Sequence, residues 1–454
     1  MSALLLKNIY HLYQGDGEGE HSGYDLLVQN NLITTIGKGL AAPPGARVID
    51  CSHHVVIPGM VNTHHHFYQA LTRNIPEVQN AKLFDWLVHL YEIWKHVDAE
   101  AVSASSLLAM GELLKTGCTL TTDHHYLYPR GISADIMALQ FEAADTLGMR
   151  FSPSRGSMSL SRKNGGLPPD SVVQDASVIL EDSLRVIEQF HDTGEFAMRK
   201  VVLSPCSPFS VTPDLMKESA KLARSYGVRL HTHLAETADE DDYCMQVLGK
   251  RPLAYMEECG FIGEDVFYAH GIHFTDSELK LLSETGTRVA HCPSSNMRLG
   301  SGICRVREML DLGMKPALAV DGSASNDSGD MLGEVRNAML LQRVRYGSGG
   351  LTAREAFAMA TVHGAQLLNF PRTGKLLSGW TADIAVFDVR KLEYAGTQSD
   401  PLASLIFAGY NHGCEYTIVN GKVVVEHNRL IGCDEEELLD RAHTAAARLL
   451  EEHP

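Results

Sequence analysis

The stretch VVIPGMVNTHHH, residues 55–66, decides the fold of this chain. It is an apolar run with a Pro-Gly break, which predicts a buried strand, and it ends in imidazoles at His64 and His66. Side chains two residues apart in a strand point to the same side, so these two histidines can hold one cation while His65 turns away. A polar loop beside a strand can carry the same pattern, so the rest of the chain has to decide between the two readings.

A strand–loop–helix pattern repeats from residue 55 to about residue 370. Strands that alternate with helices predict a parallel sheet, and eight such units predict a closed (β/α)₈ TIM barrel of the α/β class. Nearly every candidate strand finishes in a polar residue, which favours a barrel because reactive groups in barrels converge at the carboxyl ends of the strands. The eight ends fall near His66, Asp123, Arg155, Cys206, His233, His270, His291 and Asp321.

The two flanks of the chain have a different character. Residues 1–54 alternate short β-like runs with turns, and β character returns after residue 371, including a hairpin around Asn420-Gly421. An amphipathic helix is expected over residues 434–452. We therefore predict two domains: a catalytic barrel of residues 55–370, and a small β-sandwich with a C-terminal helix, built from residues 1–54 and 371–454.

Composition narrows the function. The chain has 454 residues and a formal charge of −17, which argues against a nucleic-acid partner and is compatible with a small neutral or cationic ligand. Nine scattered cysteines without a C-x-x-C pair predict free thiols and a cytoplasmic location. The apolar run at residues 3–6 is too short for a signal peptide, and no segment is apolar enough to span a bilayer.

Two further stretches carry chemistry. HTHLAE, residues 231–236, again places imidazoles two apart and adds Glu236, which is placed to move a proton. Only one of the two imidazoles has the geometry to face the mouth, and His231 is expected to support the ligands and not to be one of them. VDGS, residues 320–323, ends an apolar strand in Asp321, a carboxylate that would be costly to bury without a cation. Neutral imidazoles with one carboxylate suit Zn²⁺ or Fe²⁺.

Taken in order, these motifs resemble those of the amidohydrolase superfamily, in its branch of purine, pyrimidine and s-triazine aminohydrolases. The motifs are PGMVNTHHH (58–66), HTHLAE (231–236), AHG (269–271), HCPSSN (291–296) and VDG (320–322). The resemblance covers nearly the whole chain. It implies one divalent metal ion, zinc with iron as the alternative, and a homo-oligomer of two or more copies. The implied ligands are His64, His66, His233 and Asp321, and the implied proton-handling residues are Glu236, His270 and Asp321.

A finer resemblance is to deaminases of 8-oxoguanine, carried by residues 64–73, 204–210 and 321–328. It implies a hydrolytic deaminase whose metal-activated water displaces ammonia from a ring amine. Isocytosine, guanine and hydroxylated amino-s-triazines are the alternative substrates. We expect Gln69 to pair with the heterocycle through its amide. Trp86 and Phe67 are candidates to stack on the ring, and Cys206 to line the pocket, although Trp86 and Cys206 equally suit the core.

Other readings are weaker. A non-catalytic assembly protein on the same fold would be expected to have lost metal ligands, whereas all four are present. The compact cytidine-deaminase fold needs P-C-x-x-C, and Pro205-Cys206 has no second cysteine in register. His65, His124 and His125 are expected to be hydrogen-bonded histidines, either in loops or directly behind the metal ligands, and His291 is left open between substrate contact and loop support.

Overall fold

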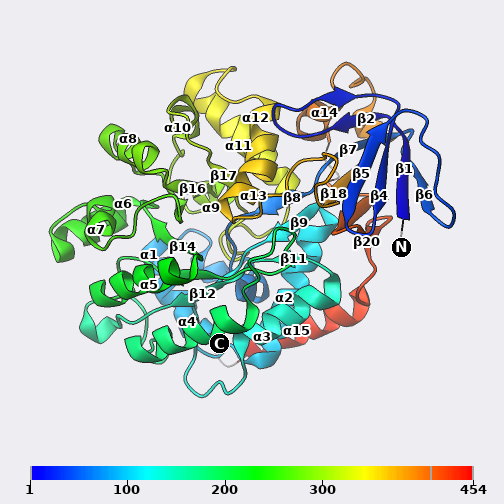
Figure 1. The fold of residues 1–454 in the computed structure, drawn as a ribbon. Helices are drawn as coiled ribbons and strands as arrows, with labels where there is room; N and C mark the ends of the chain where they lie inside the picture. Colours follow the sequence, from blue (N-terminus) through cyan, green and yellow to red (C-terminus); the bar gives the residue numbers. More distant parts are fainter. Residues whose placement is uncertain (1–2, 410–411, 452–454) are drawn as a thin grey trace.

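The structure is a computed structural model that describes residues 3–409 and 412–451. Its centre is a TIM-like barrel of parallel strands with helices around it (Figure 1). Hydrogen bonds from Thr63 N–H to the Leu318 carbonyl (3.2 Å) and from Asp321 N–H to the His64 carbonyl (3.0 Å) join the first strand segment to the last. The barrel strands are β8 (Met60–Asn62), β9 (Cys118–Thr121), β10 (His124–His125), β11 (Arg150–Phe151), β12 (Ser154–Ser157), β13 (Val202–Pro205), β14 (Arg229–Leu234), β15 (Val266–His270), β16 (Arg288–His291) and β17 (Ala317–Leu318).

Two of the predicted strands are each divided in two, β9 with β10 and β11 with β12. Pro153, which has no N–H to donate, lies between β11 and β12. The neighbouring amides keep the ladder in register, since His124 N–H binds the His65 carbonyl (2.7 Å) and Ser154 N–H binds the Asp123 carbonyl (2.6 Å). The pairs therefore occupy the second and third positions of the eight predicted.

The opening stretch divides between two sheets. β7 (His54–Pro58) pairs with β18 (Ile384–Asp388) and β2 (His11–Tyr13), so the barrel begins at Met60 rather than at Val55. Gly59 makes the transition because the chains are too close there for a side chain: a Cβ would lie 2.2 Å from Thr119 Oγ1.

The segments that flank the barrel form two sheets with a shared core. One has the order β5-β4-β1-β6 and the other β21-β20-β19-β18-β7-β2-β3. One hydrophobic cluster draws Leu6 and Val28 from the first sheet and Val56 and Ile384 from the second. In Figure 1 the blue N-terminal strands lie beside the orange C-terminal ones. The remaining strands are β1 (Ala3–Ile9), β3 (Glu20–His21), β4 (Tyr24–Gln29), β5 (Leu32–Gly37), β6 (Arg47–Asp50), β19 (Tyr416–Val419), β20 (Lys422–Glu426) and β21 (Arg429–Leu430).

Local signals explain several turns and helix ends. The predicted Asn-Gly hairpin joins β19 to β20, with Asn420 at φ 49° and Gly421 at φ 79°. Capping boxes at Thr275 and Thr352 begin the helices α8 (Asp276–Thr285) and α12 (Ala353–Ala358). The predicted C-terminal helix is α15 (Glu435–Glu451), which packs on α2.

The α-helices are α1 (Leu83–Trp94), α2 (Ala99–Lys115), α3 (Ile136–Leu147), α4 (Ala176–Phe190), α5 (Pro213–Tyr226), α6 (Ala238–Tyr243), α7 (Pro252–Glu258), α8 (Asp276–Thr285), α9 (Pro293–Arg298), α10 (Val306–Asp311), α11 (Met331–Tyr346), α12 (Ala353–Ala358), α13 (Gly364–Leu367), α14 (Pro401–Phe407) and α15. Shorter 3₁₀ or π turns are η1 (Phe67–Thr72), η2 (Pro76–Val78), η3 (Arg162–Asn164), η4 (Cys244–Leu248), η5 (Met359–His363) and η6 (Leu392–Tyr394). Over the described ranges, none of these helices combines the length and apolar character needed to cross a bilayer.

Candidate metal centre and active site

The carboxyl ends of the barrel strands bring the four predicted metal ligands together. His64 and His66 follow β8, His233 lies in β14, and Asp321 follows β17. The Nε2 atoms of His66 and His233 are 3.1 Å apart, and Asp321 Oδ1 lies 3.4 Å from the Nε2 atoms of both His64 and His66. All four side chains are buried. Side chains from three distant parts of the sequence therefore converge at the barrel mouth.

The hydrogen bonds of His66 and His233 fix which nitrogen carries the proton. His66 Nδ1 lies 2.9 Å from the His124 carbonyl, and His233 Nδ1 lies 2.7 Å from the Cys206 carbonyl. A carbonyl oxygen only accepts, so both Nδ1 atoms are donors. Burial lowers the pKa of both imidazoles, which keeps them neutral. The two Nε2 lone pairs then face each other with no proton between them, an arrangement that a cation resolves.

His64 reaches the same state through a second histidine. His231 Nδ1 donates to the Phe267 carbonyl (3.0 Å), so His231 Nε2 accepts from His64 Nδ1 (2.8 Å). His64 Nε2 is left as a buried lone pair without a hydrogen-bond partner among the described residues. Three neutral imidazole Nε2 atoms and one carboxylate oxygen thus converge, which is a donor set that Zn²⁺ or Fe²⁺ accepts.

Two more histidines approach the cluster. The ring of His124 stacks on that of His233 at 4.8 Å between centroids, and its Nε2 donates to the Ser204 carbonyl (3.1 Å). His124 and His270 each belong to a group of donors, all within 4.8 Å of one another, that could hold a metal ion. The site therefore offers nitrogen atoms beyond the predicted four ligands.

Glu236 and His270 lie on the outer side of the cluster. His270 Nε2 is 3.5 Å from Glu236 Oε2 and 3.9 Å from Asp321 Oδ2. Burial raises the pKa of Glu236 well above its ordinary value, and the charges of Asp321 and Glu240 add to the effect, so this carboxyl favours holding a proton. Burial lowers the pKa of His270 to about 4, so its imidazole is neutral at pH 7.

The backbone is strained where these side chains turn into the mouth. Ala235, His270 and Asp321 have φ values of 55°, 74° and 65°. A non-glycine residue in this left-handed region costs of order 1–3 kcal/mol, and such strain collects at functional sites. Glu240 supports the first of these turns by accepting the amides of Ala235 (3.1 Å) and Glu236 (2.9 Å).

A narrow cavity opens onto the cluster. Its volume is about 30 Å³, room for about two water molecules. Gln69 Oε1 and Trp86 Nε1 are buried without hydrogen-bond partners in the part of the chain described. Gln69 packs on Gly322, where a Cβ would lie 1.9 Å from Gln69 Oε1. The lining comprises His66, Gln69, Leu83, Trp86, Leu87, Tyr91, Tyr126, Cys206, Phe209, His233, Glu236, His270, Leu299, Asp321 and Ser325.

The three predicted substrate residues, Gln69, Trp86 and Cys206, therefore share one cavity with three of the four predicted ligands, His66, His233 and Asp321. Phe67 lies elsewhere, because η1 begins directly after His66 and turns its ring onto Phe151 in the core (5.7 Å between centroids). Tyr91, Tyr126, Phe209 and Leu299 are lining residues that sequence analysis missed. Two lining residues without a predicted role, Phe209 and Ser325, fell inside the stretches 204–210 and 321–328 that carry the finer resemblance.

The remaining histidines are placed as follows. His65 Nδ1 accepts the His66 amide (2.8 Å), and His125 Nε2 donates to the Leu127 carbonyl (2.7 Å), so both are hydrogen-bonded as expected, although His125 lies in the strand β10 and not in a loop. His291 is buried at the end of β16, and neither ring nitrogen has a partner among residues 3–409 and 412–451.

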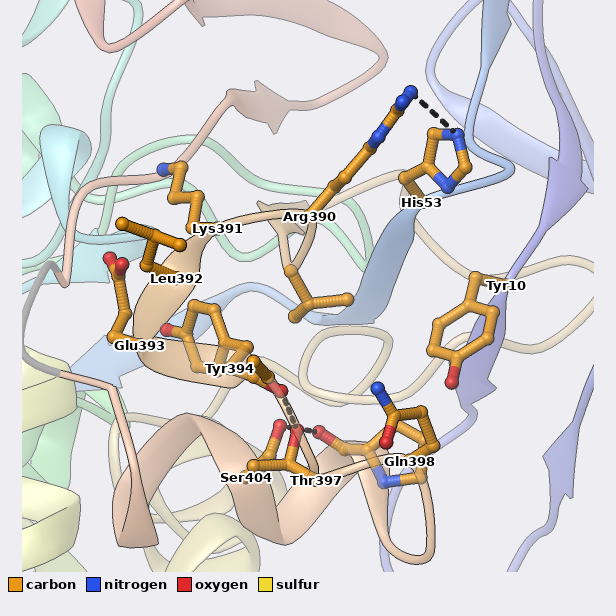
Figure 2. Close-up of a pocket in the computed structure, with 13 residues that line it drawn as sticks. Tyr10, His53, Arg390, Lys391, Leu392, Glu393, Tyr394, Thr397, Gln398 and Ser404 are labelled. Carbon is orange, nitrogen blue, oxygen red and sulfur yellow. Dashed lines mark hydrogen bonds between the residues drawn. The ribbon is translucent and has the colours of Figure 1, made fainter.

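A larger cavity of about 750 Å³ lies on the β-rich side of the molecule (Figure 2). Its polar lining includes Tyr10, Thr397 and Ser404, and the Arg390 guanidinium points toward His53 with 3.3 Å between Nη1 and Nε2. The hydroxyls of Thr397 and Ser404 already donate to backbone carbonyls. This cavity is larger than the one at the barrel mouth, but the predicted metal ligands and proton-handling residues lie at the barrel mouth.

Comparison with known proteins shows the family to which this chain belongs. The profile of the Amidohydrolase family matches residues 55–424, and the chain belongs to this family. It is 43% identical to an 8-oxoguanine deaminase from Pseudomonas aeruginosa (strain PAO1), over 99% of this chain and 100% of that protein. It is 35% identical to a hydroxydechloroatrazine ethylaminohydrolase from Pseudomonas sp. (strain ADP), over 99% and 96% of the two chains.

A solved structure is also similar to this chain over nearly its whole length. Atrazine chlorohydrolase from Arthrobacter aurescens TC1, solved in complex with zinc, is similar with a TM-score of 0.93 and 29% identity, over 98% of this chain and 100% of that one. This chain is a hydrolytic deaminase of the amidohydrolase family, acting on C–N bonds, with a histidine-rich site of the kind that holds a metal ion.

Proposed function

We propose that this protein deaminates 8-oxoguanine. The choice of substrate is supported by the 43% identity to an 8-oxoguanine deaminase across essentially the full length of both chains. The reaction adds water across the C–N bond of the ring amine, forming a ring carbonyl and releasing ammonia. It consumes one water and needs no oxidant or reductant.

One divalent cation, zinc in the first instance, would be held by His64, His66, His233 and Asp321. A cation at this position supplies an activated water, because coordination lowers the pKa of water from 15.7 towards roughly 7. The zinc bound to the similar atrazine chlorohydrolase supports this choice, and Fe²⁺ is the alternative for the same donors.

The chain's own residues then handle protons. Asp321 is placed to accept a proton from the water. Glu236, whose buried carboxyl favours the protonated form, donates to a ring nitrogen as the tetrahedral carbon forms. His270 lies within 4 Å of both carboxyl groups and orients the water by a hydrogen bond. Asp321 then passes the water proton to the amine, which leaves as ammonia, and the new hydroxyl gives its proton to Glu236 as the ring carbonyl forms.

The cavity gives a reason for a carbonyl-bearing heterocycle. The Gln69 amide offers a donor and an acceptor together, and the Trp86 indole N–H is a second donor without an internal partner. An unpaired buried polar group costs about 1–3 kcal/mol, which a matching substrate recovers. Leu83, Trp86 and Leu87 of α1 form one wall of this cavity.

The test is steady-state release of ammonia by the zinc-loaded protein from 8-oxoguanine, guanine, isocytosine and a hydroxylated amino-s-triazine. We expect the highest kcat/KM for 8-oxoguanine. A higher value for another member of the panel would replace the substrate, and no ammonia from any member would refute the proposal.

The s-triazine is retained as the second candidate because of the 35% identity to the hydroxydechloroatrazine ethylaminohydrolase. The name of that protein indicates that the group it removes is an ethylamino group. Comparing ammonia with ethylamine release on matched triazines separates the two specificities.

We further propose that the two flanking sheets form a β-sandwich domain around their shared hydrophobic cluster, with the barrel as the catalytic domain. We also propose a homo-oligomer of at least two copies and a cytoplasmic location, the latter supported by nine free thiols. Sedimentation of the purified protein tests the oligomer.

A further inference from the structure

A contact from the HCPSSN segment reaches His270 from behind. Asn296 lies in the short helix α9, which follows β16, and its Nδ2 is 3.0 Å from His270 Nδ1. Both side chains are almost completely buried, at 0% and 1% exposed. This is the one hydrogen bond that the His270 ring makes to a described residue, so it decides which ring nitrogen carries the proton.

The opposite edge of the ring faces oxygen. His270 Nε2 is 3.5 Å from Glu236 Oε2 and 3.9 Å from Asp321 Oδ2. Asp321 holds its charge because its pKa is lowered well below the ordinary value by the neighbouring histidines, so an Nε2 lone pair there would face carboxylate lone pairs, whereas an N–H is attracted to them. The favourable arrangement therefore has the proton on Nε2 and a lone pair on Nδ1, which accepts from the Asn296 amide.

We propose that Asn296 is a positioning residue that fixes His270 in its Nε2–H tautomer. Held this way, His270 presents a hydrogen-bond donor to the site and has no free Nε2 lone pair with which to bind a metal ion. The proposal deepens the proposed function, because it rests on the role given there to His270. It also distinguishes His270 from the three histidines whose Nε2 lone pairs face the cluster.

The same short helix is fixed on its other sides. The backbone N–H of Asn296 donates to the Cys292 carbonyl (3.0 Å), and the backbone N–H of Ser294 donates to the buried Glu334 carboxyl (3.1 Å). The neighbouring Ser295 hydroxyl donates to Ser325 Oγ (2.9 Å), which lies 3.5 Å from Asp321 Oδ2. Consecutive residues of α9 thus support two catalytic residues, which gives the segment a reason to be rigid.

The direct test is the protonation of the His270 ring in the zinc-loaded protein at pH 7. Histidine ¹⁵N resonances separate protonated from unprotonated ring nitrogens, and the His270 signals are those lost in His270→Gln. We expect Nε2 protonated and Nδ1 unprotonated. A protonated Nδ1 with an unprotonated Nε2 would overturn the proposal, because the Asn296 oxygen would then be the acceptor.

Two substitutions extend the test. Asn296→Asp replaces the donor with an acceptor and should move the proton to Nδ1, while Asn296→Ala should leave a mixture of tautomers. Both should keep zinc, and kcat should fall about 10- to 100-fold with a smaller change in KM. Asn337→Asp is the matched control, because Asn337 donates to Ser294 on the same helix (2.9 Å) and does not contact His270.

The outcomes are separable. Unchanged His270 signals in both Asn296 variants would refute the positioning role, whatever the activity. The expected signals in a protein that releases no ammonia from any substrate would leave the positioning role intact and refute only the proposed function. If Asn296→Asp fails to fold, the wild-type spectrum and Asn296→Ala still decide the question.

Discussion

The molecule contains two His-x-His stretches, His64–His66 and His231–His233, that look alike in sequence and differ in use. Both members of the first pair turn an Nε2 lone pair to the centre of the site. Only His233 of the second pair does so, while His231 lies behind His64 and accepts its Nδ1 proton at 2.8 Å. Spacing of two residues predicts that both histidines of a pair lie on the same side of the chain. It does not predict which of them reaches the centre of the site, as His233 does, and which hydrogen-bonds a proposed ligand from behind, as His231 does.

A second parallel lies in the turn that follows each pair. The amide of Phe67, after His66, donates to the buried Asp123 carboxyl (2.6 Å), and the amides of Ala235 and Glu236 donate to the buried Glu240 carboxyl. Burial raises the pKa of Asp123 to about 7 and that of Glu240 to about 8. Each stretch thus leaves its strand through a turn held by a buried acid.

The largest effect is expected from removing a central imidazole. His66→Ala and His233→Ala each delete one of four converging donors and leave the others facing one another. We expect the loss of stoichiometric metal and of measurable ammonia release. Metal analysis of the purified variants checks this, and a variant that kept both would remove that residue from the ligand set.

Glu236→Gln comes next, because it removes the proposed proton donor and leaves the four proposed metal ligands intact. Metal content should match wild type while kcat falls about 10²- to 10⁴-fold. Turnover near the wild-type rate would show that the proton comes from another group.

His231→Phe sharpens the contrast between the two stretches. The His231 ring already stacks on Phe267 at 4.1 Å, so a phenyl ring keeps the packing and removes only the acceptor for His64. We expect zinc affinity or activity to fall about 10- to 100-fold.

His231→Gln restores an acceptor oxygen and should recover part of that loss. Competition with a chelator measures the affinity, and equal values for the two variants would mean that the tautomer of His64 is set elsewhere.

The smallest effect concerns the buried acids. Their folded pKa values lie above the unfolded values of about 4, so the native state holds more protons between about pH 4 and pH 7–8. The stability that each acid contributes through this difference in pKa is complete below the unfolded-state pKa. It is lost as the pH rises through the folded-state pKa.

Asp123→Asn and Glu240→Gln should therefore each flatten the fall in stability with rising pH, by up to about 1.4 kcal/mol per pH unit. Urea unfolding from pH 5 to pH 9 measures the slope. A slope equal to that of wild type would show that the acid is ionised in the folded protein.

Much of this site follows from strand ends. Period-two spacing predicted the shared side of His64 and His66, and the polar residue after each apolar run marked the barrel mouth. The split of residues 55–61 between two sheets did not follow, because the partner of β7 is β18, more than 300 residues away. The contact between Asn296 and His270 also depends on two separate strand ends meeting in space, and the misplaced Phe67 reflects a turn that η1 makes directly after the strand.

Anomalous diffraction at the zinc edge from crystals of the zinc-loaded protein tests the central claim most directly. We predict one peak, about 2.0–2.2 Å from the Nε2 atoms of His64, His66 and His233 and from a carboxylate oxygen of Asp321. A peak that excludes any of these four, or that includes His124 or His270 Nε2 in place of one, would contradict the account.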